Sequence, residues 1–214
     1  MMSSNVLSPT KRVVVYIDGF NFYFGMRESH WKCYYWLDFP KLTSFLATRL
    51  EDAKLAETKY FTARINAPDS KRRRQNDYLE VLAQRGDIKF YFGNYRNKII
   101  TCGACNHPNY LHNEKQTDVN IAVQLIVDAF EDLYDVAIVL SGDSDLVPPI
   151  KEVRRLFPTK RILACFPPKR RSKEIRQVCN GEIIIGEADL KHHQLPDEVK
   201  RADGHVYRRP EKWK

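Results

Sequence analysis

The chain alternates short runs of β-branched and other apolar residues with longer segments that have helical spacing. Runs of this length are typical of strands buried on both faces, and parallel strands need a long crossover, usually a helix, between them. The alternation therefore predicts an α/β domain with a mostly parallel sheet covered on both faces by helices. The strands are expected at 12–17, 57–66, 87–93, 136–142, 160–166 and 181–186.

Helices are expected between these strands, and the clearest one lies in 115–134. Its apolar residues recur at the spacing of one helix face, so this face is predicted to be buried. The face consists of Val119, Ala122, Val123, Ile126, Val127 and Phe130. A helix at 37–50 is expected to be capped by Asp38, and a helix at 69–86 by Asp69 or Ser70.

These elements predict one folded unit at 12–190, flanked by two segments of different character. Residues 1–11 have no strand or helix pattern and are expected to be disordered. Residues near 94–113 lack helical spacing and are interpreted as an inserted β-ribbon or loop that contains cysteines. Residues 191–214 form a polar, basic C-terminal tail that is expected to be loosely held.

Positive charge is clustered along the chain, with 35 Lys and Arg against 27 Asp and Glu and a net charge of +8. The clusters at 71–74 and 167–176 favour a polyanion such as nucleic acid, although a solvated surface explains them equally well. No run of about 18 apolar residues and no apolar leader occur, so no membrane partner is expected. The five cysteines are expected to be reduced thiols or metal ligands in a cytoplasmic protein.

Four aspartates lie where the predicted strands end or where a predicted helix begins. Asp18 follows the first strand directly, and Asp143 and Asp145 follow the apolar run "VAIVL". Asp118 lies in the first turn of the helix that leads back to that run. Since ligands of parallel sheets bind beyond the carboxyl ends of the strands, the four carboxylates are expected to converge. Four anions repel each other unless a cation is present, and carboxylate oxygens suit Mg²⁺ or Mn²⁺.

Each aspartate also has a simpler explanation. Asp118 favours a helix N-terminus through the dipole, with Thr117 as the cap, and Asp18 suits a turn. Asp143 or Asp145 suits the N-cap of the next helix. The metal interpretation is preferred because all four acids fall at the edge where an α/β sheet places its site. The chain also has no P-loop, no dinucleotide-binding glycine pattern after the first strand and no G-x-S-x-G elbow.

Three stretches together resemble the NYN domain family, which belongs to the PIN-like metal-dependent ribonucleases. They are "YIDGFNFY" at 16–23, "EKQTDVNIAVQLIVDAF" at 114–130 and "LSGDSDLVPPIKEVR" at 140–154. Leu146 stands where many relatives have Phe, which is a conservative difference. The resemblance extends from about residue 12 to about residue 186 and implies a three-layer α/β/α PIN-like fold.

The resemblance implies roles for five residues of this chain. The acids of the family fall on Asp18, Asp118, Asp143 and Asp145, which would ligate Mg²⁺ or Mn²⁺, and Asn21 matches a family asparagine that would orient the phosphate or water. The implied activity is an endoribonuclease in which metal-activated water hydrolyses phosphodiester bonds in RNA. The alternative is a non-catalytic RNA-binding or regulatory module on the same fold. RNA is the expected partner; single-stranded DNA and an oligomer remain open.

Basic residues are expected to hold the phosphates of the nucleic acid. They are Lys71, Arg72, Arg73, Arg74, Lys115, Lys169, Arg170 and Arg171. Lys115 is explained more simply as an exposed lysine at the start of a helix. The aromatic stretch "HWKCYYWLDF" at 30–39 offers rings that could stack on unpaired bases, but such rings more often close the edge of a core or a dimer interface.

The stretch "CGACNHPNYLH" offers a second metal site. Cys102 and Cys105 have the C-x-x-C spacing of half a zinc site. The second half is irregular, so the zinc would be completed by His112 or by another chain. The alternative is a reduced, metal-free pair in a loop.

Overall fold

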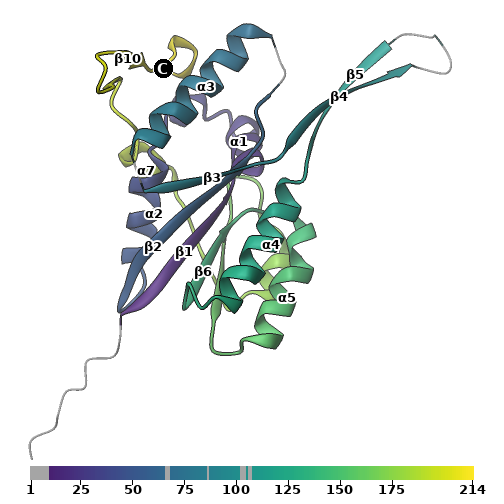
Figure 1. Ribbon diagram of the computed structural model, residues 1–214, viewed down its shortest axis with the longest axis vertical. Helices are drawn as coiled ribbons and strands as arrows, with labels where there is room; N and C mark the ends of the chain where they lie inside the picture. The colour runs from purple at the N-terminus through teal and green to yellow at the C-terminus, as the bar shows by residue number, and fades with distance from the viewer. Residues whose placement is uncertain (1–9, 66–67, 86, 102–104, 106–107) are drawn as a thin grey trace, which may run out of the picture.

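The computed structural model describes residues 10–65, 68–85, 87–101, 105 and 108–214. Six strands form one sheet in the order β3-β2-β1-β6-β7-β8, and every neighbouring pair is parallel (Figure 1). The predicted parallel sheet is thereby confirmed. The strands are β1 (Lys11–Asp18), β2 (Ala53–Thr62), β3 (Ile88–Phe92), β6 (Val136–Leu140), β7 (Arg161–Cys165) and β8 (Gly181–Ile183).

The strand order reverses between β1 and β6. The chain runs outward from β1 to β3, returns across the sheet, and runs outward again from β6 to β8. Ile17 of β1 pairs with Tyr60 of β2 on one side and with Leu140 of β6 on the other. Because all the strands are parallel, their carboxyl ends share one edge, and the reversal opens a place for a ligand at this edge.

Helices cover both faces of the sheet, which gives the three layers that were expected (Figure 1). One face carries α1 (Gly19–Glu28), α2 (Phe39–Thr48), α3 (Asp69–Gln84) and α7 (Glu187–His192). The other face carries α4 (Thr117–Phe130), α5 (Val147–Leu156) and α6 (Lys173–Val178). Each face of the sheet has its own hydrophobic core. Successive residues of β1 point alternately into the two, so Val15 packs in the first core and Tyr16 in the second.

One of the three predicted helix caps is confirmed, and two are wrong. Asp38 caps α2, because its carboxylate accepts a hydrogen bond from the Lys41 N–H. The N-cap of α3 is Pro68, so the prediction of Asp69 or Ser70 was wrong. α4 begins after Gln116, which has a left-handed φ of 79° and makes no side-chain cap bond. Thr117 is therefore the first residue of α4 and not its cap.

The buried face of α4 was predicted wrongly. The helix buries Ile121, Leu125, Asp128 and Ala129, while the side chains of Val119 and Phe130 are 61% and 65% exposed; Val123 and Val127 are exposed too. Apolar residues occur nearly all round this helix, so their spacing fits more than one face. The buried face is the one that carries Asp128, whose carboxylate has a buried cationic partner.

That partner is Lys59 of β2. The Lys59 ammonium lies 2.7 Å from one Asp128 oxygen and donates to the other at 2.8 Å, and both residues are 1% exposed. The Tyr16 hydroxyl also donates to Asp128, at 2.5 Å. This buried network joins α4 to β1 and β2, so it fixes the position of the helix whose first turn carries Asp118.

The segment inserted after β3 is an antiparallel ribbon of β4 (Asn94–Thr101) and β5 (Pro108–Lys115). In Figure 1 the ribbon extends away from the sheet. Of the two expectations for this segment, the β-ribbon is therefore correct. Because β5 ends at Lys115, the ribbon leads directly into the start of α4.

The C-terminal segment is packed, so the expectation of a loosely held tail was wrong. β9 (Glu198–Lys200) and β10 (Val206–Arg208) form an antiparallel pair, and the segment ends in a 3₁₀ turn, η3 (Glu211–Trp213). The Trp213 ring lies 6.0 Å from that of Trp36 and 5.9 Å from that of Tyr78. A few large side chains anchor the segment although most of its residues are polar. None of the described helices is long and apolar enough to cross a membrane.

A candidate metal centre at the carboxyl edge of the sheet

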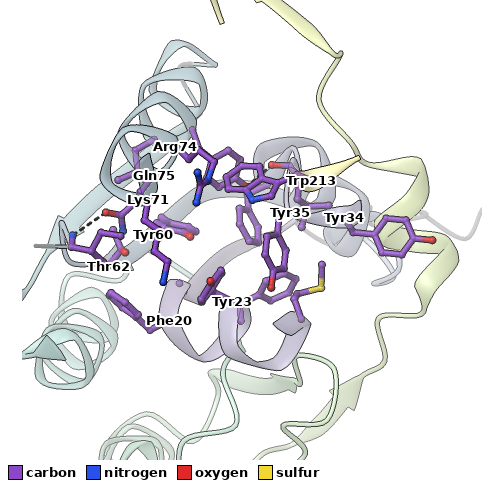
Figure 2. Close-up of a pocket in the computed structure, with 18 residues that line it drawn as sticks. Phe20, Tyr23, Tyr34, Tyr35, Tyr60, Thr62, Lys71, Arg74, Gln75 and Trp213 are labelled. Atoms are coloured by element: carbon purple, nitrogen blue, oxygen red, sulfur yellow. Dashed lines mark hydrogen bonds between the residues drawn. The ribbon is translucent and has the colours of Figure 1, made fainter. Parts of the chain in front are cut away.

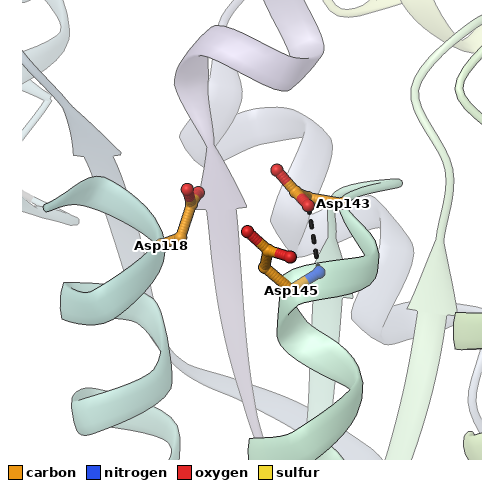
Figure 3. Close-up of side chains that lie close together, drawn as sticks. All are labelled: Asp118, Asp143 and Asp145. Carbon is orange, nitrogen blue, oxygen red and sulfur yellow. Dashed lines mark hydrogen bonds between the residues drawn. The ribbon is translucent and has the colours of Figure 1, made fainter. Parts of the chain in front are cut away.

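Three carboxylates meet at the edge where the strand order reverses. One oxygen each of Asp118, Asp143 and Asp145 lies within 4.8 Å of the other two. Figure 3 shows Asp118 in the first turn of α4, facing Asp143 and Asp145 in the turn that follows β6. The residues come from two segments of the chain and face one small volume. The sequence predicted that Asp18 would converge with them as well.

Asp143 both caps a helical turn and belongs to the carboxylate group. Its Oδ1 accepts a hydrogen bond of 3.0 Å from the Asp145 N–H, which makes it the N-cap of the 3₁₀ turn η2 (Ser144–Leu146). The same side chain belongs to the carboxylate group. Capping and clustering therefore occur together, and the cap bond orients the carboxylate.

Asp18 lies behind the three carboxylates. Its side chain is 3% exposed, Oδ1 accepts from the Asn21 N–H at 2.9 Å, and Oδ2 accepts from the Ser141 hydroxyl at 2.8 Å. The pKa of Asp18 is raised to about 6, chiefly by burial and to a smaller extent by the nearby Asp118 and Asp143 carboxylates, while the hydrogen bonds from Asn21 and Ser141 lower it. Asp18 is thus electrostatically coupled to the group, although it is not one of the three residues that meet within 4.8 Å.

Asn21 and Ser141 hold the turn that presents Asp143. The Asn21 side-chain oxygen accepts from the Gly142 N–H at 3.0 Å. The Ser141 oxygen accepts from the Asp143 N–H at 3.1 Å while its hydroxyl donates to Asp18. Asn21 was predicted to orient phosphate or water; in this geometry its oxygen positions the backbone next to Asp143.

The turn also needs a residue without a side chain at position 142. A Cβ on Gly142 would lie 1.8 Å from the carbonyl oxygen of Arg170, in the loop after β7. Glycine is needed here because two loops approach each other closely. The sequence shows that a glycine precedes Asp143, but it does not show that Arg170, 28 residues later in the chain, lies against this glycine.

We expect Gly142→Ala to destabilise the fold by about 1–3 kcal/mol, since backbone atoms must move to relieve the overlap. Gly186→Ala is a matched control, because a Cβ there would meet its nearest neighbour at 3.8 Å, an ordinary contact distance. Urea unfolding of both variants measures the difference. Equal free energies of unfolding for the two variants would show that the loop at Arg170 can move aside without loss of stability.

The carboxylate group is suited to a hard divalent cation. The pKa of Asp118 is raised by burial and then by the charges of Asp143 and Asp145. Among the described residues, no salt bridge reaches any of the three. Closely spaced oxygen donors that repel each other in this way fit Mg²⁺ or Mn²⁺.

The predicted phosphate-binding residues fall into different environments. Arg170 forms an ion pair with Glu28, Arg171 pairs with Glu182 at 2.6 Å, and Lys169 donates to the Glu28 carbonyl. On α3, Arg72 pairs with Asp69 at 2.7 Å and Arg73 is exposed, whereas Lys71 and Arg74 line a cavity. Lys115 is exposed at the end of β5.

The zinc prediction stays a prediction. Cys102 lies outside the described residues, as does the side chain of His112 on β5, and Cys105 is exposed with a free thiol. If the two cysteines hold zinc, purified protein should contain about one zinc per chain, and the Cys102→Ser/Cys105→Ser variant should lose it. Metal analysis by mass spectrometry measures this. A metal-free wild type would leave only the reduced pair.

Comparison with known proteins agrees with this fold. A relative, 6-hydroxy-3-succinoylpyridine 3-monooxygenase HspA of Pseudomonas putida (strain DSM 28022 / S16), is 30% identical over 187 residues, with 72% of this chain and 59% of that protein covered. The chain thus spans about three-fifths of the relative's length. A crystal structure of a protein of unknown function from Vibrio parahaemolyticus RIMD 2210633 matches with a TM-score of 0.59 at 18% identity, covering 87% of this chain and 98% of that one, and shares the fold. Residues 12–186 match the NYN domain, so the chain belongs to the NYN domain family.

Proposed function

We propose that this protein is a metal-dependent endoribonuclease of the cytoplasm that hydrolyses phosphodiester bonds in RNA. The observation that carries the proposal is the group of three carboxylates, Asp118, Asp143 and Asp145, within 4.8 Å at the reversal of strand order. Membership of the NYN domain family supports it, because proteins of this family are generally nucleases that act on RNA. The free cysteines among the described residues suit a reducing compartment.

In this proposal the three carboxylates hold Mg²⁺ or Mn²⁺ and Asp18 supports them from behind. A divalent ion held there would lower the pKa of a bound water and would offset the charge that develops on the phosphate. Asp18, Asn21 and Ser141 keep the Asp143 turn in place through the hydrogen bonds described above. The buried Lys59–Asp128 pair keeps Asp118 at the correct distance from that turn.

Basic residues near the same edge would hold the RNA backbone. Lys71 and Arg74 on α3 are the best placed, because they make no ion pair among the described residues. Lys115 lies two residues before α4 and three before Asp118. Arg170 and Arg171 would first have to leave their glutamate partners, so we give them a smaller share of the binding.

The competing proposal is a non-catalytic RNA-binding or regulatory module on the same fold. Such a module has no need to keep three repelling carboxylates together, because clustered like charges oppose each other without a cation. The intact group therefore favours the enzyme. RNA binding without cleavage would favour the module.

The test is cleavage of end-labelled single-stranded RNA, double-stranded RNA and single-stranded DNA in Mg²⁺, in Mn²⁺ and in EDTA. We expect internal cuts in RNA that require the divalent ion and disappear in EDTA. The triple variant Asp118→Asn/Asp143→Asn/Asp145→Asn, purified in the same way, controls for contaminating nucleases. Cleavage that persists in this variant or in EDTA would refute the proposal.

A further inference from the structure

A cavity of about 190 Å³ opens beside the carboxylate edge, on the face of the sheet covered by α1 and α3 (Figure 2). Its walls are aromatic rings, and cations lie at its rim. The rings include those of Tyr23, Tyr35, Tyr60 and Trp213. An apolar cavity of roughly 150 Å³ in a protein core accepts benzene, so this one has room for a single flat ring system.

The rings are arranged as a continuous wall. The ring centroids of Tyr23 and Tyr35 are 5.1 Å apart, and Trp213 stands edge-on to Tyr35 at 5.7 Å. Tyr23 is 42% exposed, so it remains reachable from solvent. The packed C-terminal segment thus supplies part of the wall, which the sequence did not indicate.

The cavity and the carboxylate edge share a stretch of backbone. Gly19 lines the cavity, and the preceding residue, Asp18, hydrogen-bonds to the turn that carries Asp143. A Cβ on Gly19 would lie 2.8 Å from the Tyr60 ring, so glycine permits this ring to pack against the end of β1. Burial raises the pKa of Tyr60, and the charge of Asp18 raises it further, which places the two side chains near each other.

Two cations face the cavity, and neither has a partner in the part of the chain that the structure describes. Lys71 and Arg74 lie one turn apart on α3, and Figure 2 shows both directed toward the space beside the rings. Among the described residues neither side chain makes a hydrogen bond or an ion pair, unlike Arg72, which pairs with Asp69. Gln75 holds this wall firmly, since it donates to the Ala63 carbonyl at 3.0 Å. Rings beside two unpaired cations suit a flat ring that carries an anionic group.

We propose that this cavity binds one nucleobase of the substrate, stacked against Tyr23, with Lys71 and Arg74 holding the adjoining phosphate. The inference rests on the proposed ribonuclease function and narrows it. A base inside a duplex cannot enter such a cavity, so the substrate must offer an unpaired nucleotide. The cavity then places a neighbouring phosphodiester near the carboxylate edge.

The test is a binding measurement that needs neither metal nor cleavage. Protein that carries Asp143→Asn is titrated in EDTA with uridine or adenosine 5′-monophosphate while its tryptophan fluorescence is measured. The Trp213→Phe variant shows whether Trp213 is the tryptophan whose fluorescence changes on binding. Ribose 5-phosphate provides the phosphate without the base. We expect saturable binding of the nucleotides, and at least about tenfold weaker binding of ribose 5-phosphate, because ring stacking is lost.

Variants separate the cavity from general attraction by charge. Tyr23→Ala and Arg74→Ala should each weaken nucleotide binding by roughly tenfold, while Tyr23→Phe should retain it. Arg155→Ala is the matched control, because Arg155 is exposed on α5, on the opposite face of the sheet. Circular dichroism establishes that each variant is folded.

Three results would overturn the inference. They are no nucleotide binding, equal binding of ribose 5-phosphate, and selective binding of an aromatic acid without ribose, for which 6-hydroxynicotinate is the probe. The outcome is independent of the proposed catalysis. Nucleotide binding in a protein that cleaves no RNA would support the cavity and refute the nuclease, whereas cleavage without nucleotide binding would do the reverse.

Discussion

Asp143→Asn is expected to lower metal-dependent RNA cleavage by at least ~10²-fold while leaving the fold intact. The change removes one of three carboxylates that meet within 4.8 Å, and even groups that only support metal ligands often account for 10- to 100-fold effects. Asparagine caps as well as aspartate does, so the hydrogen bond from the Asp145 N–H is kept. Relief of repulsion should leave stability unchanged or improved. Initial cleavage rates in Mn²⁺ and thermal melts measure the two effects.

Asp87→Asn is the control for this comparison. Asp87 is exposed and precedes the first residue of β3, so it lies at the amino edge of the sheet, opposite the candidate site. Its substitution removes the same charge and should leave cleavage unchanged. Full activity in Asp143→Asn together with a lowered melting temperature would mean that Asp143 is a helix cap and nothing more.

Lys59→Met is expected to lower the free energy of unfolding by about 3–5 kcal/mol, because it leaves the Asp128 carboxylate buried without its cation. The double variant Lys59→Met/Asp128→Asn removes both charges, keeps an acceptor for the Tyr16 hydroxyl and should recover part of the loss, because no uncompensated charge is left buried. Urea unfolding monitored by circular dichroism measures both variants. A double variant as unstable as the single one would show that packing, and not the unpaired charge, causes the loss.

Local patterns predicted much of the fold and the site. The run "VVVYI" inside β1 and the run "VAIVL" that forms β6 are short and apolar, and this is enough to predict strands buried on both faces. The positions of Asp18, Asp118 and Asp143 relative to those strands then follow from the rule that parallel strands end at one edge. No distant contact has to be known for these conclusions.

Tertiary contacts decided the rest. The buried face of α4 carries Asp128, whose partner Lys59 is 69 residues away in the sequence, so local spacing cannot indicate this contact. The same holds for Gly142, whose neighbour Arg170 comes from another loop. Trp213, near the C-terminus, packs on Trp36 and so becomes part of the wall of the aromatic cavity. The sequence alone does not indicate this contact between distant parts of the chain.

Binding of Mn²⁺ tests the central claim most directly, because it needs no substrate. Calorimetric titration of wild-type protein should show Mn²⁺ binding that Mg²⁺ competes away and that Asp118→Asn weakens by at least about tenfold, since one of three ligands is lost. Asp87→Asn, with its exposed acid at the other edge of the sheet, should bind Mn²⁺ as the wild type does. Equal Mn²⁺ binding by wild type and Asp118→Asn, or no binding at millimolar concentrations, would contradict a metal centre at this edge.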